Sequence, residues 1–307
     1  MTTENWRGIF NILQTPFDEA GNLLWEDFER ESDFLVRGGS HGYVWPVMAS
    51  EFTVIATHER LEGIKRAVDV VAGRIPVVIG VADTSQAGAV RLAEQAAKYG
   101  ADAIIALPPW HTKLGSLDLI QAYYFALADA AGIPTFIQNT SPPMGANLSA
   151  AYVIKLCEEH PLIQYLKEEK NPQGQSVSEV IDAAGRGAQP SAVKGVFAGA
   201  SAKYLISEYK RGVSGNMPAC VLPDLDAQIW DLLEAGDEAK AREIHNAKIV
   251  LENAMGNMPF RCRKEILRRR GVISCTASRN VGPLVLDAYE MAELDYVMGV
   301  VEPYFTV

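Results

Sequence analysis

The sequence predicts a (β/α)8 barrel, or TIM barrel, followed by a C-terminal helical extension. Short apolar runs alternate with amphipathic helical stretches from the N-terminus to about residue 216. Such alternation implies parallel strands that are joined by right-handed helical crossovers. The chain contains eight of these apolar runs, which favours a closed barrel over an open sheet.

The expected elements follow one another without a long linker. The strands are expected at residues 8–13 (GIFNIL), 42–47 (GYVWPV), 75–81 (IPVVIGV), 101–107 (ADAIIAL), 133–138 (IPTFIQ), 162–167 (LIQYLK), 192–196 (AVKGV) and 212–216 (GVSGN). The helices between them are expected at residues 25–36, 57–71, 85–98, 117–131, from 149 onward, 175–184 and 200–209. Further helical periodicity occurs at 224–235, 237–254, 260–270 and 286–298. We therefore expect a barrel over residues 1–222 and a helical extension over residues 223–307 that packs on it.

Composition excludes several classes of protein. With 48% hydrophobic and 21% charged residues, the chain has the composition of an ordinary soluble globular protein. Its net charge of −10 argues against a nucleic-acid partner, and we interpret the basic run at 261–270 as a solvated face or a subunit contact. No run approaches the roughly 18 apolar residues that span a membrane. The four cysteines are widely spaced and the N-terminus has no signal-peptide pattern, so we expect reduced thiols and a cytoplasmic protein.

Lys167 is the residue most informative about chemistry. In a parallel barrel the active site lies at the carboxyl ends of the strands, and Lys167 ends the sixth expected strand with the same parity as Ile163 and Tyr165. If that face is the interior, burial disfavours the charged form of the amine and yields the free base that attacks a carbonyl. The alternative is a lysine that reaches solvent or pairs with Glu168 or Glu169.

Several segments together resemble the dihydrodipicolinate synthase / N-acetylneuraminate lyase family of class I aldolases and dehydratases. The similar segments are GIFNILQTPF at 8–17, PPW at 108–110, YLKE at 165–168 and GVSGN at 212–216. They occur in the family's order across nearly the whole chain. The resemblance implies that Lys167 forms a Schiff base with a 2-oxo acid, and that the protein is a homotetramer.

The chain departs from the family's pattern at two places. The family's carboxylate-binding GTTGE motif is VMASE at residues 47–51, and its proton-relaying tyrosine is replaced by Gln138, which precedes Asn139. A phenol can relay a proton, whereas a carboxamide only donates and accepts hydrogen bonds. Both departures resemble the L-2-keto-3-deoxyarabonate dehydratase branch, as do Trp110-His111 and the Lys-x-Glu arrangement of Lys167 and Glu169.

The resemblance suggests further site residues, and each has a purely structural alternative. Substrate contacts are expected at Ala49, Ser50, Glu51, Asn139, Gly199 and Ser214. Glu51 could instead cap a helix or order its loop. Glu169 is expected to be the acid and base that replaces the missing phenol, or else an ion-pair partner of Lys170 or an arginine. His111 is expected to be a proton relay or an interface residue, and the histidines show no metal-ligand spacing.

The sequence therefore predicts a metal-independent class I lyase that dehydrates a 2-keto-3-deoxy sugar acid. No cofactor is expected, because the iminium that Lys167 forms is itself the electron sink. Two alternatives stay open. One is a pyruvate-releasing aldolase or a dihydrodipicolinate synthase-like enzyme. The other is a non-catalytic barrel that binds small carboxylates as a sensor.

Overall fold

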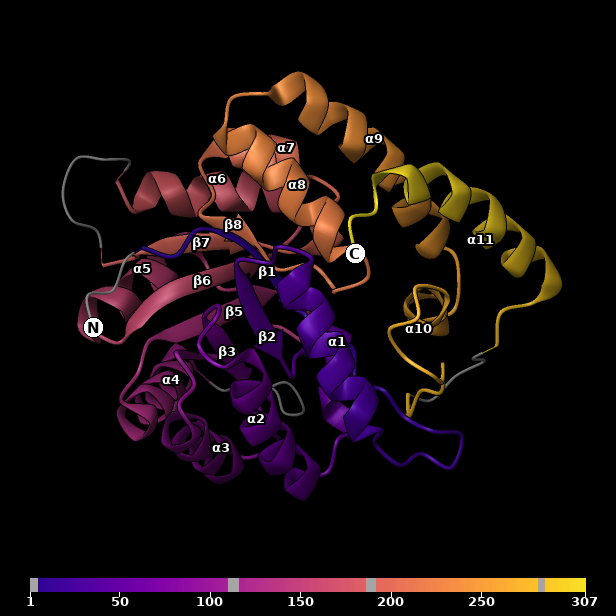
Figure 1. Cartoon of the computed structure of the whole chain (residues 1–307). Coiled ribbons are helices and arrows are strands. Elements are labelled where there is room, and N and C mark those ends of the chain that lie inside the picture. The colour runs from indigo at the N-terminus through magenta and orange to yellow at the C-terminus, as the bar shows by residue number, and fades with distance from the viewer. Residues whose placement is uncertain (1–4, 110–115, 186–191, 281–284) are drawn as a thin grey trace.

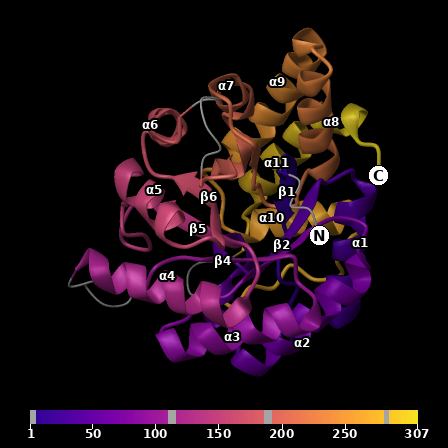
Figure 2. The same ribbon diagram turned by 90° about the vertical axis from the view of Figure 1, so that its left-hand side faces the viewer.

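The computed structural model describes residues 5–109, 116–185, 192–280 and 285–307. Eight parallel strands form a closed barrel in which each strand pairs with the next along the chain and β8 pairs with β1. Helices α1 to α6 surround the strands in Figure 2. The (β/α)8 barrel expected from the sequence is confirmed.

The elements lie close to their expected positions. The strands are β1 (Gly8–Ile12), β2 (Gly42–Trp45), β3 (Val77–Gly80), β4 (Ala103–Ala106), β5 (Thr135–Thr140), β6 (Ile163–Glu169), β7 (Gly195–Ala198) and β8 (Gly215–Asn216). The helices between them are α1 (Trp25–Arg37), α2 (Thr57–Val71), α3 (Gln86–Tyr99), α4 (Leu117–Ala131), α5 (Ala150–Glu159), α6 (Gln173–Ala183) and α7 (Leu205–Arg211). The helix expected at 200–209 begins only at Leu205, because Ala200, Ser201 and Ala202 all have φ near +50°.

The barrel interior is a packed core. Phe10, Phe136, Tyr165 and Phe197 fill it from four strands, and all are buried. The Phe136 and Tyr165 rings stack with their centroids 4.6 Å apart. This aromatic layer lies below the carboxyl ends of the strands. A side chain that points inward beyond Tyr165 therefore has buried aromatic rings beneath it.

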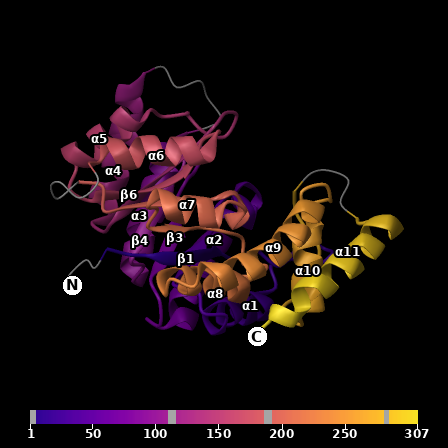
Figure 3. The ribbon, with the colours of Figure 1, turned by 90° about the horizontal axis from the view of Figure 1, so that it is seen from above.

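The C-terminal part consists of α8 (Pro223–Glu234), α9 (Glu238–Met255), α10 (Arg261–Arg269) and α11 (Ala288–Val301). Helix α8 packs on β1 and contacts both α1 and α7, so it takes the eighth place in the helical ring. Helix α9 packs between α8 and α11. Figures 1 and 3 show α9, α10 and α11 grouped on one side of the barrel, beside α8.

The basic run on α10 differs from the solvated face that we expected. The side chains of Lys264 and Glu51 pair at 2.6 Å and are fully buried. Arg270, which follows the helix, bonds Asp224 at 2.8 Å and is likewise almost completely buried. The interpretation as a solvated face is therefore wrong for these two residues, because α10 packs its cations against acidic groups of the barrel.

All four cysteines are free thiols, and only Cys275 is not fully buried. Among the residues that the structure describes, no helix is both long and apolar enough to span a bilayer.

Candidate functional site

Lys167 lies near the carboxyl end of β6 and points into the mouth of the barrel. Its neighbour across the sheet is Gln138 on β5, and Asn139 is likewise opposite Glu168. Lys167 is only 2% exposed. Because side chains alternate along a strand, Tyr165, Lys167 and Glu169 share the inward face.

Glu169 connects the lysine to the neighbouring strand. Its Oε2 lies 3.0 Å from Nζ of Lys167 and accepts a hydrogen bond of 2.8 Å from Nε2 of Gln138. The structure thus brings together three of the four expected catalytic residues. When the amine attacks a carbonyl carbon, a carboxylate that contacts the amine also lies close to the atoms next to that carbon. A general acid or base has to lie at such a position.

A cavity of about 280 Å³ opens above these groups. It is lined by Ile12, Met48, Ala49, Lys167, Glu169, Ala200, Ser201, Met217, Ala219, Phe260 and Arg263. The walls are mostly apolar, with charged groups supplied by Lys167, Glu169 and Arg263. This combination of an enclosing apolar wall and a few placed polar groups is typical of small-molecule sites.

The segment expected to bind the substrate carboxylate is engaged with the protein itself. Ala49 lines the cavity, but the Ser50 hydroxyl donates to the Leu13 carbonyl at 2.7 Å. The Glu51 carboxylate accepts from Lys264 and from the Ser278 hydroxyl, each at 2.6 Å. Glu51 therefore joins the loop after β2 to the C-terminal extension, in line with the structural alternative for this residue.

Gly199 makes room for the Glu169 carboxylate. A methyl group placed on Gly199 would stand 2.2 Å from Oε1 of Glu169. The three residues after Gly199 form a left-handed turn, a conformation that costs non-glycine residues about 1 kcal/mol or more each. Nζ of Lys248 on α9 donates to the Ser201 carbonyl at 2.7 Å, which stabilises this turn.

Asn139 and Ser214 lie away from the cavity. The Asn139 amide bonds Glu168 at 2.8 Å and also holds the backbone of Leu148. Burial raises the pKa of the Glu168 carboxyl, while the hydrogen bond from Asn139 acts in the opposite direction. The Ser214 carbonyl accepts from the amide of Gly8 at the amino end of the barrel, so the structure does not bring Ser214 to Lys167.

His111, the fourth expected catalytic residue, lies outside the described residues. Sequence reasoning missed Arg263 and Phe260 of the cavity, although the basic run that contains Arg263 was itself visible in the sequence.

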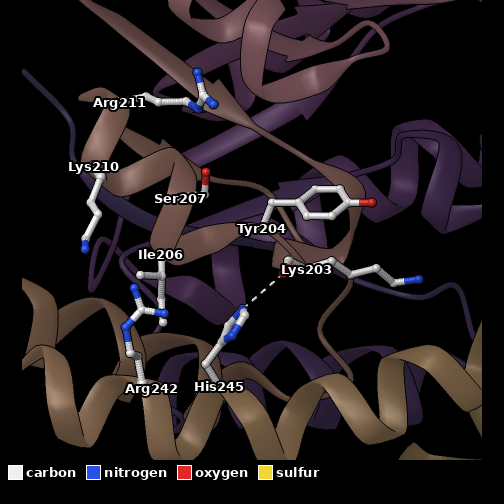
Figure 4. A pocket seen from close by; sticks show the side chains of 8 residues that line it. All are labelled: Lys203, Tyr204, Ile206, Ser207, Lys210, Arg211, Arg242 and His245. Atoms are coloured by element: carbon white, nitrogen blue, oxygen red, sulfur yellow. Dashed lines mark hydrogen bonds between the residues drawn. The ribbon is translucent and has the colours of Figure 1, made fainter.

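A second hollow, of about 490 Å³, lies between α7 and α9. It is lined by Lys203, Tyr204, Ile206, Ser207, Lys210, Arg211, Arg242 and His245 (Figure 4). The charged ends of Lys203 and Arg211 lie apart in Figure 4, with Arg211 near the top of the view and Lys203 at its right. Lys210 and Arg242 both contact Glu238 at 2.7 Å. The cations of this hollow do not converge on one point, which leaves the cavity at Lys167 as the stronger candidate.

Comparison with known proteins identifies the family to which the chain belongs. The model of the dihydrodipicolinate synthetase family matches residues 5–293. An L-2-keto-3-deoxyarabonate dehydratase from Azospirillum brasilense is 28% identical over 287 residues, which cover 92% of this chain and 90% of that protein. A 4-hydroxy-tetrahydrodipicolinate synthase from Rhizobium meliloti is 28% identical over 273 residues, or 88% of this chain and 90% of the relative. The crystal structure of dihydrodipicolinate synthase from Rhodopseudomonas palustris superposes with a TM-score of 0.87 at 22% identity, covering 96% of this chain and 98% of that one, a likeness of fold.

Proposed function

The chain belongs to the dihydrodipicolinate synthetase family of Schiff-base lyases, and we propose that it is a hydro-lyase that dehydrates a 2-keto-3-deoxy sugar acid. The observation that supports this most directly is the contact of Glu169 with both Lys167, at 3.0 Å, and Gln138, at 2.8 Å. Glu169, which can donate and accept protons, lies beside the amine of Lys167. The facing residue on the neighbouring strand is Gln138, whose carboxamide cannot take that role.

The reaction begins with the amine of Lys167. Glu169 takes a proton from Nζ, which then attacks the C2 carbonyl of the substrate. The same proton returns to the carbinolamine oxygen, which leaves as water, and an iminium forms that withdraws electrons from C3. Glu169 removes a proton from C3, which gives an enamine. The enamine electrons expel the C4 hydroxyl, which takes the proton from Glu169 and leaves as water. Addition of water to the resulting iminium releases the dehydrated 2-oxo acid and restores the amine.

The role of Gln138 separates dehydration from aldol cleavage. Cleavage of the C3–C4 bond requires a base that takes the proton from the C4 hydroxyl, and a carboxamide has no pKa suited to that task. Gln138 instead donates to Glu169 and orients its carboxylate. The dehydratase named among the relatives supports the same preference. The homotetramer expected from the resemblance stays a prediction.

The proposal is tested by trapping and by product analysis. Borohydride reduction in the presence of pyruvate or a 2-keto-3-deoxy acid should add one ligand mass at Lys167, and Lys167→Ala should abolish both the adduct and turnover. Lys170→Ala is the matched control, because Lys170 follows on the same segment and pairs with Glu179 at 3.6 Å. An adduct at another lysine contradicts the assignment of the nucleophile.

Product analysis distinguishes the two lyase reactions. A dehydratase releases no pyruvate from a 2-keto-3-deoxy acid, whereas an aldolase releases one pyruvate for each turnover, which coupled lactate dehydrogenase detects. Pyruvate as the main product from every such acid would favour the aldolase. Saturable binding without adduct or turnover would favour a carboxylate sensor.

A further inference from the structure

The arginines of helix α10 and of its C-cap differ in their partners. Four of them contact a carboxylate: Arg261 contacts Glu19 at 3.4 Å, Arg268 and Arg269 contact Glu265 at 2.8 and 2.9 Å, and Arg270 contacts Asp224 at 2.8 Å. Arg263 is the exception. In the part of the chain that the structure describes, no carboxylate forms an ion pair with its guanidinium, although the buried Glu252 lies near enough to interact electrostatically.

Arg263 faces the catalytic cavity. It is half-buried, lines the cavity together with Phe260, and its guanidinium carbon lies 5.2 Å from the centre of the Phe260 ring. The ring face attracts the cation and limits its motion. Partial desolvation of a guanidinium that forms no ion pair costs free energy. The interaction with Glu252 offsets part of this cost, and an anion in the cavity would offset more.

Arg263 is the basic group of the cavity that is left to meet a bound anion. Among the described residues that line it, Lys167 and Glu169 contact each other at 3.0 Å, and Glu252 is not one of the lining residues. Of the segment expected to bind the carboxylate, Met48 and Ala49 line the cavity but bring no charged side chain to it. The Ser50 side chain bonds Leu13 and the Glu51 carboxylate bonds Lys264 instead.

We propose that Arg263 binds a carboxylate of the 2-oxo acid that Lys167 attacks. The guanidinium presents two parallel N–H groups that match the two oxygens of a carboxylate. The inference rests on the proposed function in one respect, which is that the ligand is a 2-oxo acid. Two carboxylates are compatible with this chemistry, namely the group beside the C2 carbonyl and a second carboxylate at the far end of a dicarboxylic substrate.

The test measures how the trapped fraction depends on ligand concentration. Pyruvate has only the carboxylate beside its carbonyl, whereas 2-oxoglutarate carries a second one. Arg263→Gln should raise the concentration for half-maximal borohydride trapping by about 10- to 150-fold, the range expected for hydrogen bonds to a charged group. For Arg263→Lys this concentration should lie between the values of Arg263→Gln and the native protein. Arg261→Gln is the matched control, because Arg261 does not line the cavity and pairs with Glu19.

The outcomes separate the two sources. Weaker trapping of both ligands assigns Arg263 to the carboxylate beside C2, and weaker trapping of 2-oxoglutarate alone assigns it to the far carboxylate. Unchanged trapping of both, or an equal loss in Arg261→Gln, overturns the inference.

A failure of the proposed function is recognised separately. If the native protein forms no adduct with any 2-oxo acid, titration calorimetry with lactate and glutarate still tests Arg263, because neither compound has a keto group that could react with Lys167. Binding that Arg263→Gln weakens supports the inference, and binding that this variant leaves unchanged, or no binding to the native protein, contradicts it.

Discussion

Replacing Gly199 with alanine tests whether the position of the Glu169 carboxylate limits turnover. The added methyl carbon would stand 2.2 Å from Oε1 and 2.7 Å from Cδ of Glu169. Favourable contact between such atoms begins at roughly 3.5 Å, so the carboxylate has to move by about 1 Å. That shift disturbs the 3.0 Å contact of Glu169 with Lys167 and the 2.8 Å hydrogen bond from Gln138.

A misplacement of about 1 Å in a catalytic group can reduce the rate by about 10²-fold. Gly199→Ala should therefore lower kcat by about that factor, while the amine of Lys167 remains available for borohydride trapping. Insertion of a methyl group into a packed site also costs about 1–3 kcal/mol of stability. Steady-state kinetics, adduct mass and thermal denaturation measure the three effects.

Two variants separate the effect on Glu169 from a general loss of structure. In Glu169→Ala the obstructing side chain is gone, so adding Gly199→Ala should lower kcat little further. Gly299→Ala, on α11 with no atom within 4 Å of the added methyl, should leave kcat unchanged. A normal kcat in Gly199→Ala, or an undiminished further loss in the Glu169→Ala background, would refute the reasoning.

Two other predictions concern carboxyl groups. Glu169→Gln should lower turnover by about 10²–10⁴-fold, the usual worth of acid–base help, and spare most of the trapping at Lys167; a kinetically silent variant would remove Glu169 from the mechanism. Glu31 is fully buried, and desolvation raises its pKa from 4.5 to about 8. The folded protein thus holds a proton that the unfolded chain releases above pH 4.5, so stability falls as pH rises towards 8 and then levels off. Glu31→Gln should remove this dependence and stabilise the protein by up to about 3 kcal/mol at pH 7, measured by chemical denaturation between pH 5 and 8; an unchanged pH dependence would contradict it.

The positions of Lys167 and Glu169 followed from the sequence because they depend on local geometry. Alternation along a strand places residues two apart on one face, so Tyr165, Lys167 and Glu169 had to point the same way once the segment was a strand. The same alternation puts Asn139 and Glu168 on the outer face, where their side chains bond each other. The expectation that Asn139 contacts substrate came from the resemblance, without this parity being applied to it.

Other features depend on contacts between distant segments. Glu51 and Lys264 are 213 positions apart, and no pattern in either segment identifies the other as its partner. The left-handed turn at Ala200, Ser201 and Ala202 looked like the start of a helix, because alanine and serine are compatible with one. Its conformation is supported from outside the segment, by Lys248 on α9.

The sequence by itself determined the barrel and the common face of Tyr165, Lys167 and Glu169, since hydrophobic periodicity reports the environment of each short segment. Only the tertiary structure decided that this face is the barrel interior and what surrounds the lysine. Arg263 reaches the cavity because α10 packs across the barrel, with Lys264 buried against Glu51 and Arg270 against Asp224. A run of basic residues has the same local pattern on a solvated helix as on one whose cations are buried, and the difference arises from the acidic groups that the fold places opposite them.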